Sequence, residues 1–212
     1  MISRLRLFAG PNGAGKTTLS RRIHHEYQLD YGQYINPDDR AFALQAEGFG
    51  SEEACFIEAQ RQAVMQRQEL LQRKQSMTYE SVMSHESHLD FVAAANRQAY
   101  RSYLYYIGVA SPEMCLSRVR SRVASGTGHR VPEGKIAPRY QRSLEQLPAM
   151  CRLVRRAFLF DNSGDKHVFI GEITPEQELK LFRGEIASVG GAAWLIGSLV
   201  ANWPEEKIRW EP

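Results

Sequence analysis

The sequence predicts an α/β protein with a mainly parallel central sheet and helices on both of its faces. Two observations support this prediction. Short apolar segments rich in β-branched and aromatic residues alternate with longer helical segments along most of the chain. A glycine-rich turn, residues 10–17, joins the first apolar segment directly to the first helical one. Parallel strands need crossover connections of this kind, and such sheets are covered on both faces.

The first half of the chain begins with an apolar strand at residues 5–9, and after the turn a helix runs over 16–27. A second short strand at 34–36 ends in Pro37-Asp38-Asp39, whose polar side chains we expect to cap a helix beginning near Arg40. The next elements are predicted by a serine cap with an apolar helical stripe and by segments rich in strand-forming residues. These are a helix at 51–74, a strand at 77–82, a helix at 87–98 and a strand at 102–110.

In the second half, Ser111-Pro112-Glu113 caps a helix that reaches about Val123, where the Ser-Gly-Thr-Gly run at 125–128 breaks it. Pro132 opens the next helix. Two later strands are expected at 157–160 and 167–170. The apolar run at 189–203 is too short and too interrupted to cross a bilayer, so we interpret it as a packing helix.

Composition limits the class of protein. The 212 residues, 43% hydrophobic and 24% charged, suit one soluble globular domain spanning 1–212. A net charge of +3 is too small to favour nucleic acid or a membrane as partner. The three cysteines form no C-x-x-C pair and no signal peptide follows Met1, so a cytoplasmic location is expected. Arginines gather between Arg118 and Arg156 with only Glu133 and Glu145 as carboxylates, which suits an anionic ligand.

The turn matches G-x-x-x-x-G-K-[ST], the P-loop pattern, in the strand–loop–helix context that the pattern requires. Its backbone amides and the helix N-terminus can surround phosphates, while Lys16 reaches the β- and γ-oxygens and Thr17 can hold Mg²⁺. The expected ATP-binding residues are Gly10, Pro11, Asn12, Gly13, Ala14, Gly15, Lys16, Thr17 and Thr18. The fold prediction therefore becomes a P-loop kinase-like three-layer sandwich.

Other P-loop classes lack support in this sequence. It contains no Asn-Lys-x-Asp guanine-reading motif and no Leu-Ser-Gly-Gly-Gln motif of transporter ATPases. The apolar run before Asp161 looks like a Walker B strand, which would give a metal-binding carboxylate. Its late position favours a place for Asp161 near the nucleotide base or the sheet edge instead.

Several further motifs, taken together with the P-loop, give the chain a family resemblance. They are Asn36-Pro37-Asp38, Tyr79-Glu80-Ser81-Val82-Met83-Ser84-His85, Gly128-His129-Arg130-Val131-Pro132 and Asp161-Asn162-Ser163. With them, the chain resembles the zeta toxin family, in its compact stand-alone branch, over residues 4–163. The resemblance implies an ATP-dependent kinase that phosphorylates the 3′-hydroxyl of the amino sugar in UDP-N-acetylglucosamine, and a possible antitoxin protein as partner.

The resemblance also implies roles for single residues. Asp38 corresponds to the catalytic base, although a carboxylate there could equally cap the next helix. Glu80 corresponds to a substrate-orienting carboxylate, with a buried structural acid as the alternative. Val82 stands where many toxins carry a threonine, so one polar sugar contact is missing. Asn162 is expected near the adenine.

A mobile, arginine-rich lid is expected over residues 112–147. Lid arginines can stabilise the charge on the transferred phosphoryl group and exclude water. Arg118 and Arg122 share one helix face, and Arg122 is favoured because it is nearer the loop. Arg130 is the second catalytic candidate, and His129 and Arg139 are expected to bind substrate. Two alternatives stay open: a kinase of another hydroxyl, such as a nucleoside, an antibiotic or an RNA end, and a non-enzymatic nucleotide-gated binding module.

Overall fold

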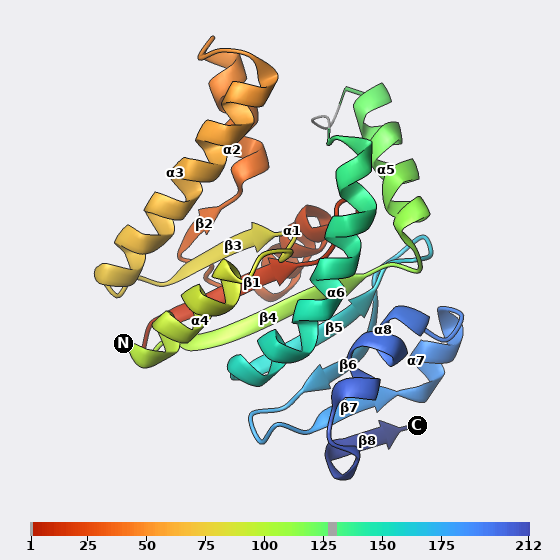
Figure 1. The fold of residues 1–212 in the computed structure, drawn as a ribbon. Coiled ribbons are helices and arrows are strands. Elements are labelled where there is room, and N and C mark those ends of the chain that lie inside the picture. Colours follow the sequence, from red (N-terminus) through yellow and green to blue (C-terminus); the bar gives the residue numbers. More distant parts are fainter. Residues whose placement is uncertain (1, 127–130) are drawn as a thin grey trace.

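A single sheet of eight strands forms the centre of the protein. The computed structural model describes residues 2–126 and 131–212 and gives the strand order β2-β3-β1-β4-β5-β6-β7-β8 (Figure 1). The strands are β1 Arg4–Ala9, β2 Gln33–Ile35, β3 Met77–Ser81, β4 Arg101–Gly108, β5 Arg156–Asp161, β6 Val168–Ile173, β7 Leu179–Phe182 and β8 Ile208–Glu211. The strand that leads into the P-loop, β1, lies between β3 and β4 and is buried along nearly its whole length.

The sheet is mainly parallel, which confirms the prediction, but its last part is mixed. Strands β2, β3, β1, β4 and β5 are all parallel to one another. Strand β6 pairs antiparallel with β5 and β7, and β8 returns parallel to β7. Only a short loop joins β5 to β6, and such a loop suffices for a hairpin but is too short for a parallel crossover.

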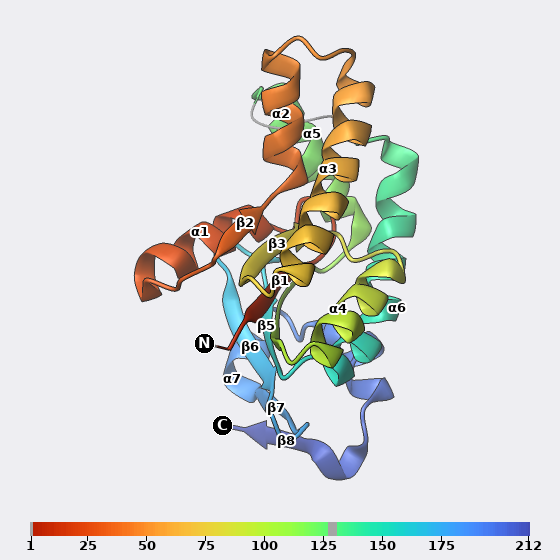
Figure 2. The same cartoon turned by 90° about the vertical axis from the view of Figure 1, so that its left-hand side faces the viewer.

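Helices cover both faces of the sheet. Figure 2 shows α1 on one face and α4 and α6 on the other, which gives the predicted three layers. The helices are α1 Lys16–Tyr27, α2 Pro37–Ala46, α3 Glu52–Gln72, α4 Ser87–Arg97, α5 Pro112–Ala124, α6 Ile136–Leu153, α7 Arg183–Ser188 and α8 Ala193–Ser198. The central strands supply the largest fully buried side chains, among them Leu5, Leu7 and Phe8 on β1.

Two pairs of helices extend beyond the carboxyl ends of the strands as separate arms (Figure 1). One arm is the α2–α3 hairpin, and the other consists of α5 and the first turns of α6. Ser51 and Ser111 cap α3 and α5 as predicted, each accepting a hydrogen bond from a backbone amide. The ligand side of a parallel sheet is its carboxyl edge, so the arms flank the place where a ligand is expected.

The cap of α2 differs from the prediction. The side chain of Asn36, not Asp38 or Asp39, accepts the hydrogen bond from a first-turn amide, that of Asp38. The helix begins at Pro37 rather than near Arg40. Proline suits the first helical position because its ring fixes φ and its missing N–H needs no partner there.

The C-terminal apolar run is not one helix. Within residues 189–203 only α8 and a short 3₁₀ turn, Val200–Asn202, are helical, because Gly190 and Gly191 interrupt the segment. The sequence analysis also missed β7, β8 and α7, all shorter than seven residues. None of the helices in the described part of the chain has the length and apolar character needed to span a membrane.

Candidate functional site

The P-loop lies between the end of β1 and the start of α1, as the motif predicts. A Cβ atom on Gly10 would lie 2.1 Å from the Ile107 carbonyl oxygen of β4, so no larger residue fits there. Gly15 has φ +90°, and a Cβ on it would lie 2.6 Å from Nδ2 of Asn162. Gly15 is also the N-cap of α1 and offers no side-chain cap, which leaves the first amides of the helix for an anion.

Lys16 folds back over the loop. Its Nζ donates to the carbonyl oxygens of Gly10 and Pro11, both at 3.0 Å. Burial lowers the pKa of Lys16, while Glu80 and Asp38 act in the opposite direction, and the Arg122 cation lowers it further. The ammonium group therefore lies within electrostatic reach of both predicted carboxylates and of the predicted lid arginine.

Glu80 is the second-last residue of β3, the strand beside the P-loop strand, and is only 7% exposed. Its Oε2 accepts a hydrogen bond from Thr17 Oγ1 at 2.7 Å, and its Oε1 accepts from Ser20 Oγ at 2.9 Å and from the Tyr34 hydroxyl. Burial and the Glu80 charge both raise the pKa of Tyr34, so this phenol stays protonated and donates. A hydroxyl and a carboxylate side by side are the oxygen ligands that Mg²⁺ prefers, directly or through water.

Asp38 lies in a pocket of about 220 Å³ next to the P-loop. The pocket is also lined by Lys16, Glu80, Val82 and Arg139. Asp38 raises the pKa of Arg139, which burial and Arg142 lower, so the carboxylate is close to this guanidinium as well as to Lys16. The cap of α2 comes from Asn36, and Asp38 lines the pocket from the first turn of this helix.

The two candidate lid arginines of α5, Arg118 and Arg122, have different surroundings. Arg122 influences the pKa of Lys16, which places its charge near the tip of the P-loop lysine. Arg118 lies one turn earlier; its Nη2 donates to the Gly164 carbonyl at 3.3 Å, and its Cβ would be 3.3 Å from a Cβ on Gly13. Arg118 therefore packs against the loop. The predicted residues His129 and Arg130 lie outside the described part of the chain.

Two residues from the loop between β5 and β6 hold the P-loop from its other side. Asn162 Nδ2 donates to the Ala14 carbonyl at 2.9 Å, and His167 Nε2 lies 3.1 Å from the Gly15 carbonyl oxygen. The sequence analysis named Asn162 but missed His167. No local motif identifies His167, because it reaches the P-loop only through the antiparallel hairpin of β5 and β6.

Asp161 is neither at the sheet edge nor beside the P-loop strand. It ends β5, which β4 separates from β1, and it is fully buried. Its Oδ2 accepts a 2.6 Å hydrogen bond from the Trp194 indole of α8, and its Oδ1 accepts from the Ser163 amide at 2.7 Å. Asp161 thus anchors the C-terminal helix.

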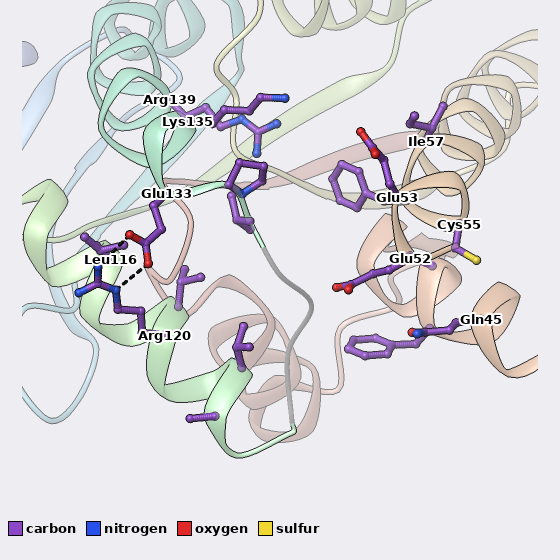
Figure 3. A pocket seen from close by; sticks show the side chains of 18 residues that line it. Gln45, Glu52, Glu53, Cys55, Ile57, Leu116, Arg120, Glu133, Lys135 and Arg139 are labelled. Atoms are coloured by element: carbon purple, nitrogen blue, oxygen red, sulfur yellow. Dashed lines mark hydrogen bonds and ion pairs between the residues drawn. The ribbon is translucent and has the colours of Figure 1, made fainter. Parts of the chain in front are cut away.

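A larger pocket of about 780 Å³ separates the two arms (Figure 3). Apolar side chains of both arms line it, and Glu52 and Glu53 of α3 lie across it from Lys135 and Arg139. Phe56 and Arg139 line this pocket and the smaller one. The two spaces are therefore neighbours, and one extended ligand could occupy both.

Comparison with known proteins identifies the family. The AAA domain family designated AAA_33 matches residues 5–147, and the chain belongs to it. A search of curated proteins finds no significant match. Among solved structures, by contrast, many chains match significantly.

The AvrRxo1-ORF1:-ORF2 complex with ATP matches with a TM-score of 0.67 and 16% identity, over 88% of this chain and 63% of that one. The same complex with sulphate ions gives 0.70 and 16%, over 96% and 66%. The PezAT toxin-antitoxin system of Streptococcus pneumoniae gives 0.55 and 15%, over 97% and 82%. The chain thus spans less than two thirds of the AvrRxo1 chains. These likenesses, with the sheet and the P-loop, define a P-loop kinase-like fold.

Proposed function

We propose that this protein is an ATP-dependent kinase that transfers the γ-phosphoryl group to a hydroxyl of a small molecule. The observation that carries the proposal is that Asp38 and Lys16 line the same pocket beside the P-loop and that the Asp38 charge acts on Lys16. A binding module needs only the phosphate cradle. A carboxylate close to the P-loop lysine adds what a kinase requires, a group that accepts the proton of the attacking alcohol.

Each group of residues has a separate role in the proposed transfer. The P-loop amides and Lys16 hold the triphosphate, and Thr17 with Glu80 would hold Mg²⁺, which neutralises charge on the phosphates when bound. Asp38 accepts the proton of the acceptor hydroxyl. Arg122, whose charge acts on Lys16, stabilises the negative charge that develops on the transferred group.

For the acceptor we propose UDP-N-acetylglucosamine, phosphorylated on the 3′-hydroxyl of its sugar. The proposal draws on the zeta toxin resemblance and on the neighbouring pockets, since the sugar would lie in the small pocket and the uridine in the larger one. Val82 lines the small pocket and offers no polar contact to a sugar. The test therefore includes a second class of acceptor, other small hydroxyl compounds. Asp38, Glu80 and Arg139 would contact the acceptor.

We also propose a protein partner that inhibits the kinase. Two of the similar structures are complexes: AvrRxo1-ORF1 with ORF2, and a toxin-antitoxin system. Expression of the wild-type chain in bacteria should slow growth, whereas Lys16→Ala should not. Equal growth of the two strains would argue against a toxic kinase.

The test of the kinase is a transfer assay on purified protein with ATP, Mg²⁺ and a panel of nucleotide sugars, nucleosides and simple sugars. The product should gain about 80 Da, one phosphoryl group. Asp38→Asn should lower kcat by about 10²- to 10⁴-fold and leave ATP affinity unchanged. Asp39→Asn, on the next and exposed residue, is the matched control and should keep full activity. Unchanged turnover in Asp38→Asn would refute Asp38 as the base.

A further inference from the structure

Arg67 is a cation of the small pocket that the sequence analysis did not single out. It projects from the middle of α3 and lies over the rings of Tyr79, at 4.6 Å, and Phe91, at 5.1 Å. Among the described residues it forms no ion pair with a carboxylate. Its neighbours on the same helix do: Arg61 pairs with Glu58 and Arg73 pairs with Glu69.

The aromatic faces explain how this cation is tolerated when half-buried. A guanidinium over aromatic rings gains cation–π energy, which offsets part of its lost hydration. The arrangement does not neutralise the charge, so Arg67 presents a fixed positive group to the pocket that it lines. The Tyr79 hydroxyl beside it is buried and, within the described chain, makes no hydrogen bond of normal geometry.

His88 and Ser81 continue the wall of the pocket beside Arg67. Arg67 Nη1 lies 3.4 Å from His88 Nδ1, and because a guanidinium only donates, Nδ1 must accept. Burial and the Arg67 charge lower the pKa of His88 to about 3, so the imidazole is neutral and carries its hydrogen on Nε2. Nε2 therefore donates to Ser81 Oγ at 2.8 Å.

The Ser81 hydroxyl has one hydrogen available to donate in a hydrogen bond. Its oxygen already accepts from His88 and from the Met83 amide, at 2.9 Å. A hydroxyl has two acceptor lone pairs and one donor hydrogen, so both lone pairs are occupied. Ser81 lines the small pocket, and its hydrogen can be donated to a ligand there.

We propose that Arg67 and Ser81 form an anion-binding subsite, and that the acceptor of this kinase carries a phosphate group which binds there. The inference rests on the proposed function in taking the small pocket as the acceptor site. Asp38 acts on Lys16 and Arg139, whereas Arg67 lies over the rings of Tyr79 and Phe91. An acceptor is thereby oriented, with its hydroxyl toward Asp38 and its phosphate toward Arg67, and a neutral sugar lacks this second anchor.

The subsite is tested by binding, independently of transfer. With the P-loop saturated by a non-hydrolysable ATP analogue and Mg²⁺, inorganic pyrophosphate is titrated into the protein by calorimetry. Wild type and Arg73→Met, the control on the same helix, should bind it alike. Arg67→Met should bind about 10- to 100-fold more weakly, and Ser81→Ala should show a smaller loss in the same direction. Thermal melting of each variant verifies that it is folded.

The outcomes separate the two proposals. Pyrophosphate that does not bind the saturated wild type, or binds Arg67→Met as tightly, overturns the subsite whatever the transfer assay shows. If a phosphorylated acceptor gains a phosphoryl group, Arg67→Met should raise its KM and leave kcat near the wild-type value, and a neutral acceptor should be unaffected. Arg67-dependent binding without any transfer would instead overturn the kinase assignment and leave the subsite standing.

Discussion

Replacing Glu80 by glutamine tests the group that joins the P-loop helix to β3. The carboxylate is nearly fully buried and accepts three hydrogen bonds, one on Oε2 from Thr17 and two on Oε1 from Ser20 and Tyr34. Glu80→Gln keeps the size of the side chain but replaces one oxygen by an NH₂ group, which cannot accept.

The cost depends on which oxygen is replaced. If the NH₂ group faces Thr17, one hydrogen bond is lost; if it faces Ser20 and Tyr34, two are lost. The side chain will take the first orientation, and the loss of one hydrogen bond to a charged group costs about 1.5–3 kcal/mol. A domain of ordinary stability, about 5–15 kcal/mol, survives this loss, so the variant can be purified and measured.

The measurement is urea unfolding followed by circular dichroism. Glu69→Gln is the control, since this carboxylate pairs with Arg73 at 2.6 Å on the exposed surface of α3 and should contribute less than about 1 kcal/mol. Glu80→Gln should also lose much of the stabilisation that Mg²⁺ with ATP gives to the wild type. A free energy of unfolding equal for the two variants would refute the assignment of Glu80 as the acceptor that fixes Thr17.

Three further outcomes are expected. Trp194→Phe removes the indole donor to the buried carboxylate of Asp161 and should lower the free energy of unfolding by about 1.5–3 kcal/mol in urea; a loss under about 0.5 kcal/mol would contradict this anchor. Gly15→Ala puts a Cβ 2.6 Å from Asn162 Nδ2 at φ +90° and should weaken binding of a fluorescent ATP analogue at least about tenfold, while unchanged affinity would contradict the close fit. His88, with a pKa lowered from 6.5 to about 3, takes up a proton more readily in the unfolded chain, so its stabilising contribution is full above pH 6.5 and is lost as pH falls from 6.5 toward 3. Its C2 proton should show no NMR titration between pH 8 and 5, and His88→Gln should flatten the decline in stability; a midpoint near 6.5 would contradict burial.

Local sequence was enough to predict the strands and helices up to β6. The P-loop and the serine caps of α3 and α5 each depend on interactions within a few residues. The apolar stripe predicted the α3 helix but not its buried face, since Ile57 and Val64 are exposed. The elements that were missed, β7, β8 and α7, are short, and their stability comes from pairing and packing with distant segments rather than from their own propensity. The prediction of the α2 cap was wrong for a different reason, since three nearby side chains, those of Asn36, Asp38 and Asp39, are all chemically able to cap a helix.

The residues of the candidate site show the same contrast between local motifs and long-range contacts. Lys16 and Thr17 follow from a motif of adjacent residues. Asn162 lies against the P-loop, and its expected place near the adenine stays a prediction. Arg67 and His167 carry no motif. They reach the site from the middle of a helix and from a hairpin loop, and only the fold brings them to it.

The three carboxylates at or just after strand ends show why strand order, not local pattern, decides the role of such a residue. Asp161 has the most typical metal-binding sequence context, yet one strand separates β5 from β1, so its carboxylate meets Trp194. Glu80 has no such context, but β3 lies directly against β1, and its carboxylate meets Thr17. Asp38 follows β2, one strand further out, and reaches the pocket only because α2 starts there under the Asn36 cap. In a parallel sheet, a carboxylate therefore bears on the P-loop only if its strand adjoins the P-loop strand or its following helix turns back over it.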